Sequence, residues 1–282
     1  MDWQKDILRR LFGWKKANGL RRYTECYVEV PKKNGKSTKF SGIALYGLIA
    51  DNEPGAEVYL AATSRDQASI IYREALNMVE QSPDLKAILN PIPHTKRIAY
   101  GLNAWLQALA SKVSTAEGPN AHILLIDEFH AFTSRELYDA LQWSGKARDQ
   151  PLTIIMTTAG ESLDSLCGQK HEYGKKILSG EIIDIHTLVV IYGNEPDCDI
   201  DDEENWFRAN PSLGITLDVD RFRESLNKAK NDSPAALAQF KDTWAAFQAE
   251  VSRATGFAQA FTNLRTGERC EDENALLATV LA

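Results

Sequence analysis

Val-Pro-Lys-Lys-Asn-Gly-Lys-Ser-Thr, residues 30–38, is the stretch from which the architecture of this chain can be worked out. It follows an apolar, strand-like run (Tyr27, Val28) and precedes a run that can be helical (Phe40 to Ala50). A turn between a strand and a helix that ends in Gly-Lys-Ser is typical of a nucleoside triphosphate site, because backbone N–H groups and the helix dipole at a helix start attract phosphate. Val30 stands where the usual pattern has its first glycine, so a basic surface turn is the alternative for this stretch taken alone.

Individual residues of this stretch have distinct expected roles. Lys36 would reach the β- and γ-phosphates, and the Ser37 hydroxyl would ligate Mg²⁺. Gly35 lets the backbone approach the phosphates because no Cβ stands in the way. The remaining residues that we expect at the nucleotide are Lys32, Lys33, Asn34 and Thr38.

A second informative segment runs from His122 to His130. Ile123 to Ile126 form a continuous apolar run, as expected of a parallel strand buried on both faces. Asp127 and Glu128 follow at its carboxyl end, which is where open α/β sheets bind ligands. Asp127 fits a ligand of Mg²⁺, and Glu128 fits the group that orients the attacking water. A strand that ends in solvated acids is the alternative, and the upstream Gly-Lys-Ser argues against it.

A third segment, Leu152 to Met156, is apolar and β-rich and leads into Thr157-Thr158-Ala159-Gly160. Small hydroxyl residues beside a γ-phosphate can sense its presence and pass hydrolysis on to a moving part. Alone, the segment also fits an ordinary exit from a strand into a loop. Its place after the other two segments favours a coupling role for Thr157, Thr158 and Gly160.

In combination and order, these segments resemble the ATPase part of the terminase large subunit of tailed phages, the motor that drives DNA into a procapsid. The likeness runs from about residue 1 to about residue 250. The segments that carry it are the variant phosphate loop at 30–37, the acidic strand end at 123–128, the coupling motif at 157–160, an adenine-recognition segment at 3–4 with 11–14, and a later family segment at 206–214. The resemblance implies that Gln4 contacts adenine.

The fold implied by this resemblance is a P-loop NTPase of the ASCE type, an α/β three-layer sandwich with a mostly parallel central sheet and a small helical lid or linker subdomain. The alternation of strands and helices independently favours a parallel sheet covered on both faces. We expect an ATPase core at 1–200, the helical subdomain at 201–250 and an irregular tail at 251–282, with the family's nuclease domain absent. The elements expected from the pattern are strands at 25–30, 57–62, 97–100, 104–110, 123–126, 152–158 and 182–192, and helices at 6–12, 67–80, 134–143 and 165–179.

The implied activity is hydrolysis of ATP with Mg²⁺, with Lys36 and Glu128 as catalytic residues. The implied partners are double-stranded DNA, further copies in a ring on the portal of the procapsid, and the small terminase subunit, all in the host cytoplasm. An extra cation would come from Lys32 or Lys33, or across an interface from Lys112, Arg135 or Arg148. Two alternatives stay open: a helicase-like ATPase stimulated by nucleic acid, because Asp127 to His130 reads Asp-Glu-x-His, and a shortened remnant that binds nucleotide without turnover.

Charge is unevenly distributed along the chain. The net charge is −7, which argues against a surface coated for nucleic-acid binding. Residues 1–39 nevertheless carry eleven Lys and Arg against four Asp and Glu. This cluster fits solvated helix charge, a subunit contact or a DNA contact, and the last predicts affinity that falls steeply with salt. Apolar runs are too short for a membrane span. The cysteines are scattered without metal-ligand spacing. We expect structural or solvent-facing roles for His122 and His130, and core or interface positions for Trp105 and Trp143.

Overall fold

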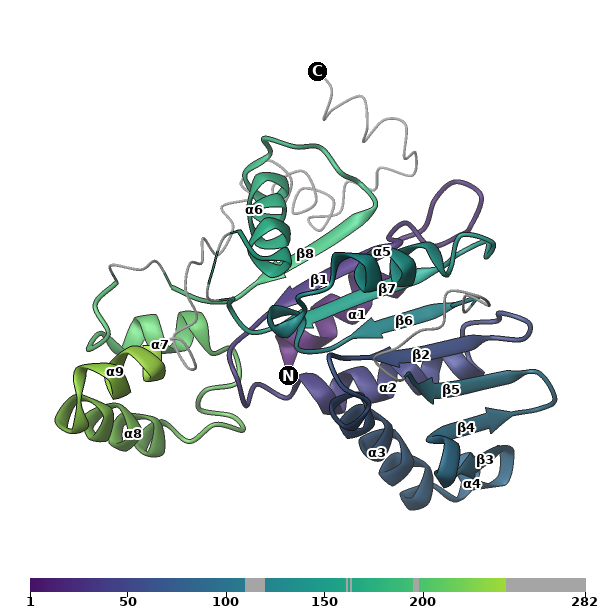
Figure 1. Cartoon of the computed structure of the whole chain (residues 1–282), viewed down its shortest axis with the longest axis horizontal. Coiled ribbons are helices and arrows are strands. Elements are labelled where there is room, and N and C mark those ends of the chain that lie inside the picture. Colours follow the sequence, from purple (N-terminus) through teal and green to yellow (C-terminus); the bar gives the residue numbers. More distant parts are fainter. Residues whose placement is uncertain (110–119, 161, 163, 195–197, 242–282) are drawn as a thin grey trace, which may run out of the picture.

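The structure is a computed structural model that describes residues 1–109, 120–160, 162, 164–194 and 198–241. Within these residues, eight strands form one sheet in the order β3-β4-β5-β2-β6-β7-β1-β8 (Figure 1). Neighbours from β5 to β8 pair in parallel, and the β3–β4 and β4–β5 pairs are antiparallel. The strands are β1 (Glu25–Glu29), β2 (Glu57–Ala61), β3 (Leu89–Ile92), β4 (Arg97–Tyr100), β5 (Ala104–Ala108), β6 (Ile123–Ile126), β7 (Leu152–Thr157) and β8 (Thr187–Ile191).

Helices cover both faces of the sheet and make the expected three-layer sandwich. One buried cluster packs α1, α2 and α3 on the sheet, and a second packs α5 and α6 on the opposite face. Successive strand residues enter opposite clusters: Val28 joins the first and Tyr27 the second. The helices of this part are α1 (Asp2–Gly13), α2 (Lys36–Ile49), α3 (Arg65–Gln81), α4 (Pro83–Ile88), α5 (Arg135–Trp143), α6 (Leu166–Ser179) and the 3₁₀ helices η1 (Pro93–Thr95) and η2 (Phe129–Ala131).

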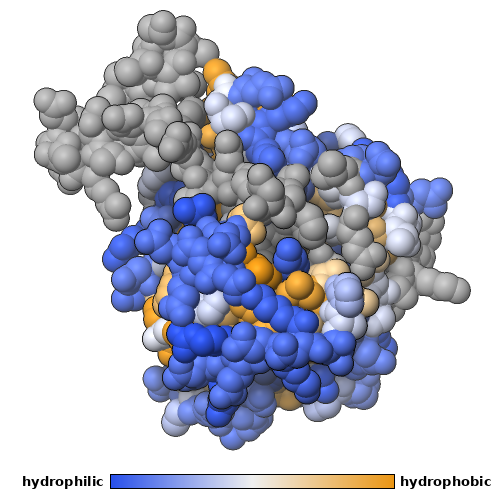
Figure 2. Space-filling model, turned by 90° about the vertical axis from the view of Figure 1, so that its left-hand side faces the viewer, coloured by the Kyte–Doolittle hydropathy of each residue, from blue (hydrophilic) through white to orange (hydrophobic). Residues whose placement is uncertain are grey.

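A small helical subdomain follows, made of α7 (Glu203–Ala209), α8 (Val219–Asp232) and α9 (Pro234–Phe240). It has its own buried cluster, in which Trp206 and Phe222 are central. Figure 1 shows these helices beside the sheet layers, and Figure 2 shows that the surface on this side is mainly hydrophilic. A helical part was expected here. Its boundaries stay predictions, and the expected tail at 251–282 lies outside the described residues.

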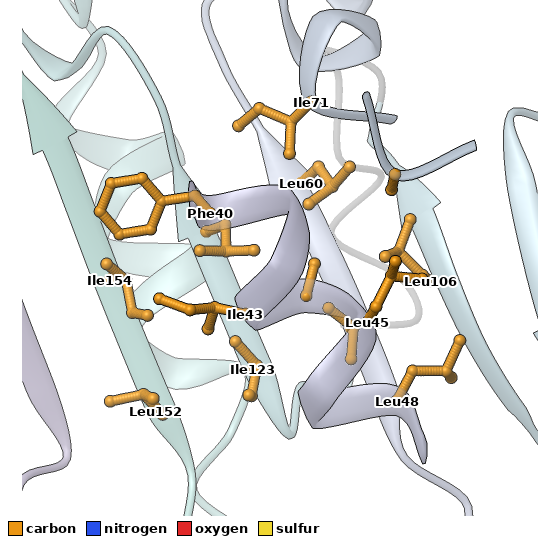
Figure 3. Close-up of a cluster of buried hydrophobic side chains, with 14 of the residues drawn as sticks. Phe40, Ile43, Leu45, Leu48, Leu60, Ile71, Leu106, Ile123, Leu152 and Ile154 are labelled. Carbon is orange, nitrogen blue, oxygen red and sulfur yellow. The ribbon is translucent and has the colours of Figure 1, made fainter. Parts of the chain in front are cut away.

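Helix α2 fixes the position of the phosphate loop, because side chains along almost the whole length of the helix are buried in the core. Phe40, Ile43 and Leu48 are nearly fully buried and pack against the sheet (Figure 3). Burial of one such side chain stabilises the fold by about 1.5–3 kcal/mol. Gly47 lets the helix approach β6 closely, because a Cβ at this position would lie against the Ile123 side chain. The amino end of α2 is therefore held rigidly over the sheet.

The sequence pattern predicted some helices and strands incorrectly. The strand expected at 182–192 begins only at Thr187, because the Asp184 side chain instead holds a turn by accepting hydrogen bonds from the His186 N–H and the Thr187 hydroxyl. Helix α4 and strand β3 were not expected. Pro91 lies in β3, and proline is tolerated there because β3 is the edge strand. Among the described residues, no helix combines the length and the apolar character that a bilayer crossing requires.

Candidate nucleotide site

The topology brings the three segments singled out in the sequence to one edge of the sheet. Strand β7 lies between β1 and β6, and all three run parallel. Their carboxyl ends therefore meet at the same edge. The phosphate loop leaves β1, Asp127 and Glu128 follow β6, and Thr157 ends β7 with Thr158 directly after it.

The phosphate loop presents a helix start that carries no side-chain cap. Gly35 is the residue before α2 and adopts a left-handed conformation with a φ of 77°, which glycine reaches without strain. Lys33 is also left-handed, with a φ of 69°. No side chain caps the helix here, so its first N–H groups are available to an anion.

Lys36 lies in a buried position between β1 and β7. Its Nζ donates to the Val30 carbonyl oxygen at 2.8 Å and lies 3.5 Å from the Thr157 carbonyl oxygen. Burial lowers the pKa of Lys36 to about 8, and the negative charges of Glu128 and Asp127 oppose that shift. The ammonium group and both acids thus share one electrostatic environment, as the sequence predicted.

The acidic pair has an excess of negative charge. Asp127 is buried and accepts a hydrogen bond from the Glu128 N–H at 2.9 Å. Burial and, to a smaller extent, the charge of the neighbouring Glu128 raise the pKa of Asp127 to about 6, against the opposing effects of the Glu128 N–H and Lys36. Glu128 has a left-handed backbone with a φ of 51°, and among the described residues its buried Oε2 has no hydrogen-bond partner. With the Ser37 hydroxyl at the start of α2, these hard oxygen donors fit a divalent cation such as Mg²⁺.

The coupling segment contacts the acidic pair through His130, for which no functional role was predicted. Thr157 and Thr158 are buried, and His130 lies between them and Glu128. Only the pattern Asp-Glu-x-His pointed to this histidine. Gly160 lies at the other end of the segment, where a Cβ would meet the Cys167 side chain at 3.4 Å.

The amino-terminal helix lies beside the phosphate loop. A Cβ placed on Gly35 would lie 3.3 Å from Gln4 Nε2, so the Gln4 amide packs directly on the loop. Trp3 donates from its indole N–H to the Ser212 hydroxyl at 3.3 Å and packs edge-on against Tyr192. The structure therefore places the predicted adenine segment next to the predicted phosphate site.

Asn34 was expected at the nucleotide, and its side chain contacts the helical subdomain. Its amide donates to Asn210 Oδ1 at 3.1 Å and accepts from the Ser212 N–H at 3.1 Å. All three residues are almost fully buried. The Asn34 side chain thus joins the phosphate loop to the helical subdomain, and only its backbone is left for a phosphate. Of the other predicted contacts, Ser37 is partly buried, whereas Lys32, Lys33 and Thr38 are exposed.

The candidate cations differ in availability. Arg148 does not fit the role, because its guanidinium bonds to Glu53 at 3.0 Å and to the Gly55 carbonyl oxygen at 2.8 Å, where β2 begins. That position is at the edge of the sheet opposite the acidic pair. Arg135 is exposed in the first turn of α5, and Lys112 lies outside the described residues.

The other aromatic and histidine predictions also have definite outcomes. His122 is buried and bonds to Asp51 Oδ2 at 2.8 Å, which is the expected structural role. Trp143 was expected in the core or at an interface; because 64% of its surface is exposed in this chain, the core is excluded and the interface stays a prediction. Trp105 is partly buried, with the Arg97 guanidinium 4.6 Å from its ring.

Solved structures share this fold. The HK97 bacteriophage large terminase superposes with a TM-score of 0.76 at 23% identity, over 87% of this chain and 50% of that chain. The large terminase ATPase domain of Thermus phage P74-26 gives a TM-score of 0.52 at 17% identity, over 86% and 98% of the two chains. The large terminase of the thermophilic bacteriophage D6E, in complex with ADP, gives 0.51 at 13% identity, over 78% and 49%. The fold is therefore the P-loop fold of terminase ATPases.

Sequence relatives agree with the structures. The terminase large subunit of Enterobacteria phage HK97 is 27% identical over 223 residues, which cover 77% of this chain and 42% of that protein. The chain therefore spans less than half of that relative. The family model described as the ATPase domain of the terminase large subunit matches residues 2–176, more than half of this chain. The chain thus belongs to the family of terminase large subunit ATPase domains.

Proposed function

We propose that this chain binds ATP with Mg²⁺ at the phosphate loop, hydrolyses it, and thereby drives viral double-stranded DNA into procapsids. One observation carries the proposal: Lys36, at the start of the helix after β1, and the Asp127–Glu128 pair, which follows β6, share one electrostatic environment at the carboxyl edge of the sheet. Membership of the terminase ATPase family supports it, as does ADP in the D6E terminase.

Each group has a role that follows from charge. The transferred phosphoryl group spreads negative charge over its oxygens as it leaves, and Lys36 lies where it can offset that charge. Ser37 and Asp127 would hold Mg²⁺, which when bound neutralises further phosphate charge. Glu128 would orient the attacking water by accepting its proton in a hydrogen bond. Gln4 would contact adenine, and Thr157, Thr158 and Gly160 would pass the loss of the γ-phosphate on to the rest of the motor.

The larger assembly is part of the proposal. We infer that copies of the chain act as a ring on the procapsid portal in the host cytoplasm, with the small terminase subunit as a further partner. Lys32 or Lys33 of the same chain, or Arg135 across an interface, would supply the additional cation, because all three are exposed. DNA stimulation of turnover should fall steeply with salt if basic residues contact phosphates.

The test separates binding from turnover. Wild-type protein should gain about 2.7 kcal/mol of stability at 100 times its Kd for Mg-ATP, seen as a rise in Tm. Lys36→Ala should lose that rise, because the phosphate charge is no longer offset. Glu128→Gln should keep the rise and lose turnover. Lys86→Ala, which removes an exposed lysine paired with Glu80, is the matched control and should behave as wild type.

Other outcomes separate the alternatives. Equal turnover in wild type and Glu128→Gln would reject the assigned role. No Tm shift of the wild type at millimolar ATP, with or without Mg²⁺, would favour the remnant. Turnover that rises with DNA alone, is indifferent to procapsids and accompanies strand separation would favour the helicase-like alternative.

A further inference from the structure

His130 connects the acidic pair to the coupling segment through a single nitrogen atom. Its Nδ1 lies 3.2 Å from Glu128 Oε2, 3.2 Å from Thr157 Oγ1 and 3.3 Å from Thr158 Oγ1. The backbone also fixes the contact, because the His130 N–H donates to Thr157 Oγ1 at 3.0 Å. His130, in the 3₁₀ helix η2 that follows β6, is thereby anchored to the end of the neighbouring strand β7.

The hydrogen bonds of Thr157 indicate that Nδ1 of the His130 ring carries a hydrogen. The Thr157 hydroxyl donates to the Thr158 carbonyl oxygen at 2.6 Å, so its only hydrogen is already used. Toward His130 it can therefore only accept. An ionised Glu128 also only accepts. Both contacts require a hydrogen on Nδ1 of the imidazole, and this assignment follows from the surrounding partners.

One N–H cannot satisfy all of its neighbours at once. In this structure the hydrogen bonds of Nδ1 go to the threonines, while the buried Glu128 Oε2 is without one among the described residues. A buried acceptor without a hydrogen-bond partner is unfavourable. The left-handed backbone of Glu128 adds strain to this arrangement. A small rotation of the imidazole would transfer the hydrogen bond from the threonines to the carboxylate.

We propose that His130 is a positioning residue of the hydrolytic site, whose Nδ1 hydrogen alternates between Glu128 and the threonines of the coupling segment. This inference rests on the proposed role of Glu128 in orienting water. When the Nδ1–H donates to Glu128, the carboxylate is held in one orientation. When the Nδ1–H donates to Thr157 and Thr158, the carboxylate is released and the end of β7 is held instead. Turnover is thus tied to the position of the coupling segment.

Substitutions at position 130 test the donor directly. His130→Ala should lower kcat by up to about 10²-fold, as expected when a reacting group is misplaced by about 1 Å. KM and the Tm shift with Mg-ATP should stay close to wild type, because nucleotide binding does not use this contact. His130→Asn carries an amide N–H near the position of Nδ1 and should recover most of kcat. His94→Ala removes an exposed histidine at the β3–β4 edge of the sheet and is the matched control.

A double-mutant cycle tests the link to the threonines. Thr158→Val should change kcat in the wild-type background and have little further effect in His130→Ala, because interacting groups are not additive. His130→Leu fills the same space without a donor and replaces the alanine variant if that variant does not fold. Full turnover in His130→Ala or His130→Leu would overturn the inference, as would additive effects in the cycle.

The controls also separate this inference from the proposed function. If Glu128→Gln abolishes turnover while the His130 variants are normal, only the role of His130 fails. If Glu128→Gln turns over as wild type does, the proposed role of Glu128 fails first. Loss of kcat in His130→Asn equal to that in His130→Ala, with both variants folded, would also count against a shared hydrogen.

Discussion

At the scale of single residues, Asp127 shows how the site trades stability for chemistry. Its pKa is raised from 3.8 to about 6, chiefly by burial. A carboxyl group with a raised pKa holds its proton more tightly in the folded state than in the unfolded chain. The folded state then binds more protons between pH 4 and pH 6, so the free energy of unfolding falls as pH rises through that window.

Asp127→Asn should therefore make the nucleotide-free protein more stable at pH 8, by about 1–2 kcal/mol. The gain should vanish near pH 4, where the aspartate is protonated in the folded state. Urea denaturation from pH 4 to pH 8 measures it. Asp139→Asn, which alters an exposed carboxylate on α5, should show no such pH dependence. An Asp127→Asn variant that is less stable than wild type at pH 8 would contradict this prediction, because it would mean that neighbouring groups stabilise the Asp127 charge more than burial destabilises it.

The sequence pattern predicted some residues of the candidate nucleotide site and not others. Lys36, Asp127 and Glu128 were predictable because strand ends in a parallel sheet meet at one edge, and residue type then limits the chemistry. The contacts of the Asn34 side chain were not predicted, because its partners Asn210 and Ser212 lie far along the chain. Such contacts depend on how side chains from different elements meet, and a local pattern does not contain that information.

At the scale of elements, the packing of α2 on β6 depends on Gly47. A Cβ there would lie 3.0 Å from Ile123 Cγ1, and closer still to Cδ1, and Ile123 is fully buried. Gly47→Ala should therefore destabilise the protein by about 1–3 kcal/mol through overpacking, even though alanine favours helix. Gly42 is the matched control in the same helix, because nothing lies within 4 Å of its Cβ position. Gly42→Ala should stabilise by up to about 1 kcal/mol, and both changes are measured by urea denaturation.

Restoring the space offers a second check on this prediction. Ile123→Val removes the methyl group nearest to the new Cβ, so it should recover part of the loss in the Gly47→Ala background. In the wild-type background the same change should itself destabilise by about 0.5–1.5 kcal/mol. Additive losses in the double variant would show that Gly47 and Ile123 do not interact as the packing implies.

Most elements were predictable because hydrophobic periodicity and caps are local. Ser64 and Ser134 cap the amino ends of α3 and α5, as the pattern of hydroxyl residues before apolar runs indicates. The order of strands was not predictable in the same way, since pairing joins residues that are distant in sequence. Strand β3 was missed because Pro91 reads as a loop residue wherever the edge of the sheet is unknown.

At the scale of the whole molecule, one buried contact joins the sheet layers to the helical subdomain. The Asn34 side chain bonds to both Asn210 and Ser212, and the Ser212 hydroxyl donates to the Asn34 carbonyl oxygen at 3.3 Å. Trp3 of α1 donates to the same hydroxyl. Phosphate loop, amino-terminal helix and helical subdomain therefore meet at Ser212.

Asn34→Ala should loosen the helical subdomain without unfolding the sheet. It leaves Asn210 Oδ1 and the Ser212 N–H buried without these partners, which is unfavourable by about 1–3 kcal/mol. Amide hydrogen exchange in α7, α8 and α9 should then accelerate by about 10–100-fold, while exchange in β1, β6 and β7 stays as in wild type. Asn18→Ala removes an amide from an exposed turn and should change neither region. Equal protection of α7–α9 in Asn34→Ala and wild type would show that their docking depends on other contacts. Faster exchange across the sheet as well would mean that the two parts unfold as one cooperative unit.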